Sequence, residues 1–304
     1  MKKTMCHKKN SLTDNIRCFL ARLRTLKYSP KTIDTYGRAL EDFAGMLSQH
    51  GVSGVLHIGR SQIDQYRLGL IERGFAAGST EVFLRAVRRF FGFLEQEQII
   101  FLNPTEGMVS QQAPRRLVPA PSEEQVARLL AQPDVSKPLG IRDRAFLETA
   151  YSTGGRRAEL MGIATRDVDL RNGTIRLMGK GSRERVVPIG NQAAGWLGKY
   201  VSEVRPILMQ GTDSPALWVG YNGHALGYGW FPSILYKYQK SNGSVRIAPH
   251  DFRRACATHM LNHGAAAVDI QMLLGHTSLR HLSQYLQLSI SELKRAHQHT
   301  NPGH

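Results

Sequence analysis

The sequence is short of cysteine, of acidic residues and of long apolar runs. Its 304 residues include three cysteines, Cys6, Cys18 and Cys256, without the paired spacing of a zinc site or a disulfide framework, which favours a reducing cytoplasm. No stretch approaches the roughly 18 consecutive apolar residues that span a bilayer, and the N-terminal MKKTMCHKKN carries charges without the apolar run of a secretory signal. We therefore expect a soluble, cytoplasmic protein with no membrane partner.

Acidic side chains are outnumbered along the whole chain. The sequence has 24 Asp and Glu against 40 Lys and Arg, a formal net charge of +16. The excess is not a tail, because residues 1–107 have 16 basic against 10 acidic side chains and residues 108–304 have 24 against 14. Such a charge on a folded protein favours a polyanionic partner, most simply nucleic acid, because bound phosphates release their counterions. Composition alone leaves a merely soluble basic protein as the alternative.

The length and a hydrophobic content of 41% predict two domains, of which the first is a helical bundle over residues 11–107. Apolar residues recur there at three- and four-residue spacing, and no alternating strand pattern interrupts them. Ser29, Ser61 and Ser79 are expected N-caps. The expected helices are 12–26, 29–50, 61–73 and 78–98.

A proline-rich segment separates this bundle from a second domain. We place a linker at residues 108–121 and the second domain, with a C-terminal helix and tail, at residues 122–304. Ser122 and Gln125 form a capping box ahead of a helix, and residues 167–190 alternate as a three-stranded antiparallel meander with Asn-Gly and Gly-Ser turns. The expected fold is mainly α with this small β-meander, an α+β class. Further helices are expected at 142–152, 193–205, 228–239, 251–263, 267–274 and 289–298.

The second domain contains the residue types that move a phosphodiester bond without a metal: a nucleophile, cations for the phosphate oxygens and an acid for the leaving oxygen. Arg156, in TGGRRAEL, follows a Gly-Gly break from which a guanidinium could reach a cleft and bind two phosphate oxygens. Lys180, in MGKGSRER, lies at the tip of the meander between glycines, where a mobile ammonium could donate a proton.

Three more candidates follow in chain order. His250 and Arg253, in PHDFRRACATHM, are three residues apart and project from one face of a helix, so both can meet one ligand. In LLGHTSLRHLSQYL, His276 follows a helix that ends at Gly275, and Tyr285 comes nine residues later. Each residue alone is more typical of packing or of a solvated charge, and the ordered set is what indicates a site.

The ordered set resembles the tyrosine recombinase, or phage integrase, family, with a Xer-like pattern over residues 11–298. The most specific segments are TGGRRAEL, GKGSRERVVPIG, HDFRRACATHM and LLGHTSLRHLSQY. The resemblance implies an N-terminal helical core-binding (SAM-like) domain and a C-terminal catalytic domain. It implies a site-specific recombinase that forms a 3′-phosphotyrosyl intermediate and a Holliday junction, without metal, ATP or cofactor. The implied catalytic residues are Arg156, Lys180, His250, Arg253, His276 and Tyr285, with Tyr285 as the nucleophile.

The same resemblance implies the partners. These are duplex DNA with inverted-repeat core sites and three further copies of the chain, in a homotetramer that joins two sites; the free protein would be a monomer or dimer. Related recombinases or accessory DNA-binding proteins are compatible further partners. The protein would integrate, excise or resolve a mobile or chromosomal element in the nucleoid. A type IB topoisomerase-like relaxing enzyme and a non-catalytic, basic DNA-binding regulator are the alternatives.

Other basic residues and histidines are candidates for DNA or metal binding. Arg85, Arg88 and Arg89 share an expected helix with several phenylalanines, which suit burial better than base stacking, and Arg115-Arg116 lie in the linker; all five are DNA-binding candidates. His297, His299 and His304 lack the spacing of a metal cage, so no metal site is expected. The sequence departs from the family pattern at Gly155, where Leu is common, and at Arg254 and Cys256, where His and Phe are common.

Overall fold

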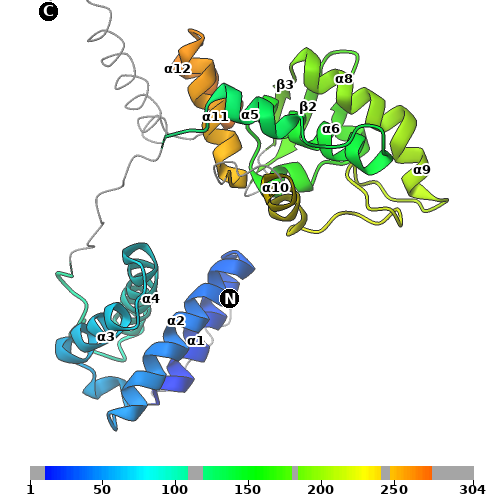
Figure 1. Cartoon of the computed structure of the whole chain (residues 1–304). Helices are drawn as coiled ribbons and strands as arrows, with labels where there is room; N and C mark the ends of the chain where they lie inside the picture. Colours follow the sequence, from blue (N-terminus) through cyan, green and yellow to red (C-terminus); the bar gives the residue numbers. More distant parts are fainter. Residues whose placement is uncertain (1–10, 109–118, 180–183, 241–246, 276–304) are drawn as a thin grey trace, which may run out of the picture. The chain divides into compact units, whose positions relative to one another are not determined.

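A computed structural model describes residues 11–108, 119–179, 184–240 and 247–275 (Figure 1). The chain divides into two compact units, residues 1–116 and 117–304. Within the described residues, no helix is long and apolar enough to cross a membrane.

The first unit is the expected helical bundle. Its helices are α1 (Leu12–Thr25), α2 (Pro30–Gln49), α3 (Arg60–Glu72) and α4 (Ala77–Gln96), with a short 3-10 turn, η1 (Val55–His57), before α3. All four predicted helices are confirmed. The hydroxyl of Ser29 accepts the backbone N–H of Thr32, so this N-cap is confirmed as well.

Two predicted N-caps are wrong, because both helices begin before the serine. The N-cap residue of α3 is Gly59, whose backbone N–H is bound by the side chain of Gln62 at 2.9 Å, and Ser61 lies within the helix. The N-cap residue of α4 is Ala76, which has no side-chain cap, and Ser79 lies within that helix.

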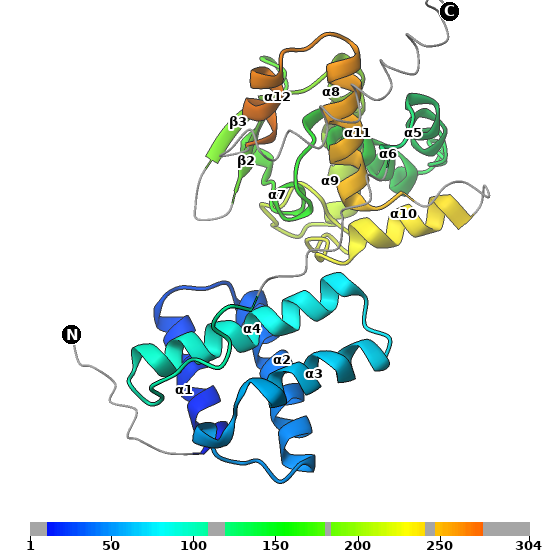
Figure 2. The ribbon, with the colours of Figure 1, turned by 90° about the vertical axis from the view of Figure 1, so that its left-hand side faces the viewer.

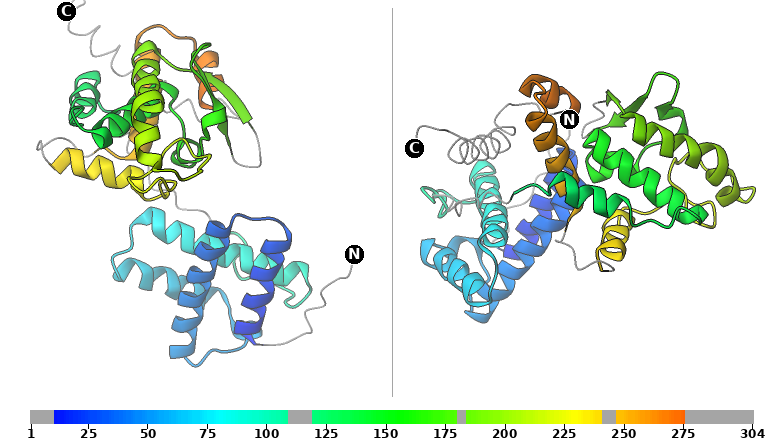
Figure 3. Two further views of the ribbon diagram at one scale, coloured as in Figure 1. Left: turned by 90° about the vertical axis from the view of Figure 1, so that its right-hand side faces the viewer. Right: turned by 45° about the horizontal axis from the view of Figure 1, so that its top comes forward.

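Aromatic side chains form the core of the bundle. Helix α2 packs against α1 and α4, which cross each other in Figure 2 and in the left panel of Figure 3. Phe90 and Phe91 are fully buried, and Phe90 meets Phe19 edge to face with ring centroids 5.8 Å apart. The interpretation of these aromatics as core residues is therefore confirmed.

The second unit is helical around one small sheet. The capping box of Ser122 and Gln125 begins its first helix, as predicted. The helix predicted at 142–152 begins earlier, at Pro138. The helices and turns are α5 (Glu123–Leu130), α6 (Pro138–Thr153), α7 (Arg157–Met161), η2 (Thr165–Asp167), α8 (Asn191–Lys199), the π-turn η3 (Tyr200–Val204), α9 (Arg205–Met209), α10 (Trp230–Lys240), α11 (Pro249–Asn262) and α12 (Ala267–Leu274).

Helix α6 lies at the centre of this unit. It packs against α8 on one side and α11 on another. Its Phe146 is fully buried and meets Trp218, Trp230 and Phe231 edge to face, with ring centroids 4.7 to 5.0 Å apart. Phe231 also contacts Phe252 near the start of α11, with ring centroids 5.9 Å apart, so α6 and α11 share one core.

The meander is confirmed as an antiparallel sheet in the order β1 (Val168–Asp169), β2 (Thr174–Met178) and β3 (Glu184–Pro188). Met178 at the end of β2 pairs with Glu184 at the start of β3, and Lys180 falls in the sequence between these two strands, outside the described residues. Figure 2 shows the short helix α12 beside β3. The helix predicted at 289–298 lies outside the described residues.

The cysteines differ in state. Cys18 in α1 is disulfide-bonded, contrary to the inference from cysteine spacing, whereas Cys256 in α11 is a buried free thiol.

Candidate active site

Three of the six predicted catalytic residues line one pocket of the second unit. The pocket has a volume of about 300 Å³. Arg156 comes from the turn between α6 and α7, and His250 and Arg253 come from the first two turns of α11. Residues almost 100 positions apart in the sequence therefore converge on one concave surface. The remaining lining residues are Gly155, Arg157, Tyr228, Ala248 and Pro249.

The Gly-Gly break places Arg156 at the pocket. Helix α6 ends at Gly154, which has φ of 55°, a left-handed conformation that glycine adopts without a Cβ clash. The backbone N–H of Arg156 then donates to Glu159 Oε2 at 2.8 Å and closes the first turn of α7. The side chain of Arg156 donates one hydrogen bond, from Nη1 to Glu159 Oε1 at 2.8 Å, and it remains 46% exposed.

Helix α11 presents His250 and Arg253 on one face, as their spacing predicted. Pro249 lies in the first turn, where backbone N–H groups have no acceptor within the helix, so its missing N–H costs no hydrogen bond. His250 follows it. Partial burial, then the positive charges of Arg253 and Arg254, lower the pKa of His250 below its usual value. The imidazole is therefore neutral near pH 7 and can accept a proton.

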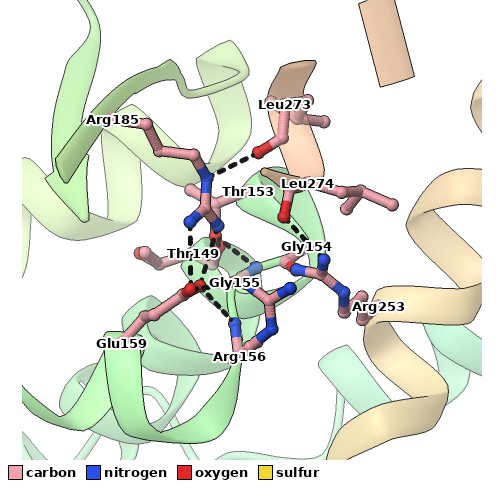
Figure 4. A network of polar contacts seen from close by, with 10 residues as sticks. All are labelled: Thr149, Thr153, Gly154, Gly155, Arg156, Glu159, Arg185, Arg253, Leu273 and Leu274. Atoms are coloured by element: carbon pink, nitrogen blue, oxygen red, sulfur yellow. Dashed lines mark hydrogen bonds and ion pairs between the residues drawn. The ribbon is translucent and has the colours of Figure 1, made fainter. Parts of the chain in front are cut away.

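Arg253 is buried, with 2% of its surface exposed, and it links the C-terminal ends of two helices. Its Nη1 donates to the carbonyl of Gly154 at 2.8 Å, and its Nη2 donates to the carbonyl of Leu274 at 2.6 Å (Figure 4). These carbonyls lie at the C-terminal ends of α6 and α12, where the last helical carbonyls have no helical partner. A guanidinium suits this place because its planar fork can satisfy both.

The structure adds two residues that sequence reasoning missed, Glu159 and Arg185. Arg185 on β3 donates Nη1 and Nη2 to the two oxygens of Glu159 at 2.9 and 2.7 Å, and its Nε donates to the carbonyl of Leu273 at 2.8 Å (Figure 4). Glu159 is thus shared by Arg185 and Arg156. The position of Glu159, three residues after Arg156, is typical of a capping box. No local spacing, however, indicates its pairing with Arg185, 26 positions later.

Two arginines keep Glu159 ionised inside the protein. Burial by itself would raise the pKa of Glu159, but hydrogen bonds from Arg185 and Arg156 outweigh it and lower the pKa to about 2. Because the folded pKa lies below the unfolded value, the carboxylate stabilises the fold above about pH 4.5, and this contribution is lost as the pH falls toward 2.

We expect Glu159→Gln to change how stability depends on acid. The free energy of unfolding of the wild type, minus that of the variant, should fall by about 2 kcal/mol between pH 6 and pH 3. Urea unfolding of both proteins at several pH values measures this difference. Glu184→Gln, at an exposed position on β3, controls for the loss of one negative charge. A constant difference across this range would contradict the ionised, buried Glu159.

Two of the three departures from the family pattern, Gly155 and Cys256, take part in packing around the end of α6. A Cβ at Gly155 would lie 2.8 Å from Leu160 Cδ2, so a larger residue there requires Leu160 to move. Cys256 lies under the same turn, with Sγ 3.2 Å from the place of a Cβ on Gly154, and burial raises the pKa of its thiol to about 12. Cys256 is therefore a neutral packing residue beside Gly154 rather than a reactive thiol.

One wall of the pocket is aromatic. The guanidinium of Arg157 lies over the ring of Tyr228, 3.5 Å from its centroid. Both residues line the pocket together with Arg156, and Arg157 adds positive charge to the lining.

Other predicted residues lie elsewhere. Lys180, His276 and Tyr285, and the linker residues Arg115 and Arg116, lie outside the described residues. In α4, Arg85 and Arg89 are exposed, whereas Arg88 forms an ion pair with Glu81 and is largely covered. In the described parts of the chain, no group of three His, Cys, Asp or Glu side chains could hold a metal ion.

A larger hollow of about 550 Å³ lies in the first unit, between α3 and α4. Its walls include Ile71, Phe75 and Leu84, with Arg60 and Arg67 among the charged lining residues. None of the three predicted catalytic residues that the structure describes lines this hollow.

Comparison with known proteins identifies the family of the chain. Residues 122–292 match the phage integrase family, and residues 16–98 match the phage integrase N-terminal SAM-like domain. Tyrosine recombinase XerD of Yersinia pestis is 36% identical over 273 residues, 89% of this chain and 91% of that protein. XerD of Pseudomonas aeruginosa is 36% identical over 272 residues, with the same coverage of both chains.

Two solved structures show the same fold. The XerH site-specific recombinase bound to a palindromic difH substrate has a TM-score of 0.76 at 19% identity, covering 94% of this chain and 84% of that one. A lambda integrase tetramer bound to a Holliday junction has a TM-score of 0.71 at 17% identity, covering 90% and 77%. The chain belongs to the phage integrase family, and it is a tyrosine recombinase, an enzyme that transfers DNA strands.

Proposed function

We propose that the protein recombines specific DNA sites through Tyr285, with Arg156, Lys180, His250, Arg253 and His276 as the other catalytic residues. The observation that carries this proposal is the pocket in which Arg156, His250 and Arg253 converge within the phage integrase domain. Two guanidinium groups beside a neutral imidazole suit a phosphate whose negative charge grows in the transition state.

The proposed reaction exchanges one phosphate ester bond for another. The Tyr285 oxygen attacks the scissile phosphorus and loses its proton, which His250 accepts. The bond from phosphorus to the 5′ oxygen breaks, and Lys180 donates a proton to that leaving oxygen. Arg156, Arg253 and His276 stabilise the phosphorane. The 5′ hydroxyl of a second DNA then attacks the 3′-phosphotyrosyl bond, so nothing is oxidised and no ATP is consumed.

The proposed assembly is a homotetramer on two DNA sites, each with inverted-repeat core sequences, and a monomer or dimer in the free protein. Two proteins of similar fold support this proposal: one is a recombinase bound to a palindromic substrate, and the other is a tetramer bound to a Holliday junction. The net charge of +16 is consistent with such a partner. We propose that the protein acts in the cytoplasm, on a mobile or chromosomal element of the nucleoid.

A nicked suicide duplex tests the function. The site is first selected by binding from a random duplex library, and then a nick is placed so that the cleaved end diffuses away and the covalent adduct accumulates. A recombinase gives both an adduct on this duplex and recombinant product from two intact sites. Relaxation of supercoils without product would instead indicate a topoisomerase-like enzyme, and binding without adduct a DNA-binding regulator.

A further inference from the structure

We propose that Arg185 is a positioning residue: it pairs with the carboxylate of Glu159, so that Arg156 stays directed to the scissile phosphate. The inference rests on the proposed function, because it takes Arg156 as a ligand of that phosphate. Arg185 lies on β3 and does not line the pocket.

The side chains of the two arginines make different numbers of hydrogen bonds to the carboxylate of Glu159. Arg185 binds both carboxylate oxygens in a fork, at 2.9 and 2.7 Å. Arg156 contacts one of these oxygens through Nη1 alone, at 2.8 Å. The side chain of Arg185 is 15% exposed and that of Arg156 is 46% exposed, so the inner arginine takes the bidentate position and the outer one faces the pocket.

Charge explains why this division matters. Glu159 is almost fully buried, and a buried carboxylate must be paired. With Arg185 present, the three side chains have a net charge of +1, which is available to an anion at the pocket. Without Arg185, Arg156 is the cation left to pair with Glu159, and a bidentate pair between them would turn its guanidinium away from the phosphate and neutralise it.

Arg185 is itself fixed from a third direction. Its Nε donates to the carbonyl of Leu273 at 2.8 Å. Gly275, with φ of 62°, passes so close that a Cβ there would lie 3.0 Å from Arg185 Nη1. The guanidinium is thus held between the end of α12 and Glu159, and it has little freedom to release the carboxylate (Figure 4).

The test compares Arg185→Met, Glu159→Gln and the double variant on the nicked duplex that carries the selected site. We expect Arg185→Met to lower the rate of adduct formation about 100-fold, because Arg156 would pair with Glu159 and no longer stabilise the transition state. DNA affinity should change less than about twofold. The double variant removes the carboxylate that captures Arg156, so its rate should rise at least about tenfold above that of Arg185→Met. A residue that only stabilises the fold would give no such rescue.

Arg176→Met is the matched control. Arg176 lies on β2 of the same sheet and pairs with the carboxylate of Asp167, but neither residue lines the pocket. Its rate of adduct formation should stay within about twofold of the wild type. If Arg185→Met does not fold, Arg185→Lys replaces it. A lysine keeps the charge but cannot fork onto both oxygens, so we expect about a tenfold loss that Glu159→Gln relieves.

The outcomes separate the inference from the proposed function. If the wild type forms no adduct on the selected duplex, the proposed function fails. If the wild type reacts but Arg185→Met reacts within about twofold of it, or if the double variant is no faster than Arg185→Met, the inference is wrong while the proposed function stands.

Discussion

Replacement of Tyr285 by Phe is expected to abolish covalent attachment to DNA. The substitution removes one oxygen, the proposed nucleophile, and keeps the aromatic ring. The rate of adduct formation on the nicked duplex should fall by roughly 10⁴-fold or more, because removing the nucleophile eliminates the step itself rather than slowing it. Electrophoresis under denaturing conditions, with the DNA end-labelled, measures the adduct.

The control is DNA affinity, which should remain within about twofold of the wild type because one uncharged hydroxyl contributes little to phosphate binding. Tyr228→Phe tests a second tyrosine, one that lines the described pocket and packs against Arg157. It should retain adduct formation. An adduct formed by Tyr285→Phe at an appreciable rate would show that another residue is the nucleophile.

Arg253→Met should reduce both stability and chemistry. The guanidinium satisfies the carbonyls of Gly154 and Leu274 in a buried place, and a thioether cannot donate to either. We expect a loss of about 3 kcal/mol in the free energy of unfolding, from two charge-assisted hydrogen bonds. The rate of adduct formation by the folded protein should fall by about 10³-fold, because a cation at the phosphate is lost as well.

Arg205→Met separates these two effects. Arg205 also spans backbone carbonyls, those of Ser214 and Ala216 at 2.6 and 2.7 Å, but it does not line the pocket. This variant should lose comparable stability and keep the wild-type rate below its unfolding transition. Urea unfolding measures the stability of both variants, and single-turnover kinetics measure their rates of adduct formation. Equal rate losses in both variants would mean that Arg253 serves the fold alone.

Much of the fold could be predicted from the sequence because its signals are local. Helical periodicity located α1 to α4, and the alternation with an Asn-Gly turn located the sheet. Two helix starts were predicted too far along the chain, because Ser61 and Ser79 are residue types that favour the N-cap but lie inside their helices. At Gly59, the capping oxygen comes from Gln62 downstream rather than from the first residue.

The convergence of three candidate residues on one pocket could be predicted for a similar reason. Arg156, His250 and Arg253 could be found because each lies in a distinctive segment with a local structural signal, and the pocket confirms that they meet. Arg185 could not be found, since its role depends on Glu159 and on the carbonyl of Leu273, 26 and 88 residues away. The burial of the Arg185–Glu159 pair is a tertiary property that no short sequence pattern contains.

The most direct test of the central claim is to identify the residue that holds the DNA. The wild-type adduct on the nicked duplex is digested with nuclease and trypsin, and the peptide that retains a nucleotide is sequenced by mass spectrometry. Tyr285 is the one tyrosine in the tryptic peptide of residues 281–294, HLSQYLQLSISELK. We predict a 3′-linked nucleotide on that tyrosine. A nucleotide on any other residue, or a 5′ linkage, would contradict the account.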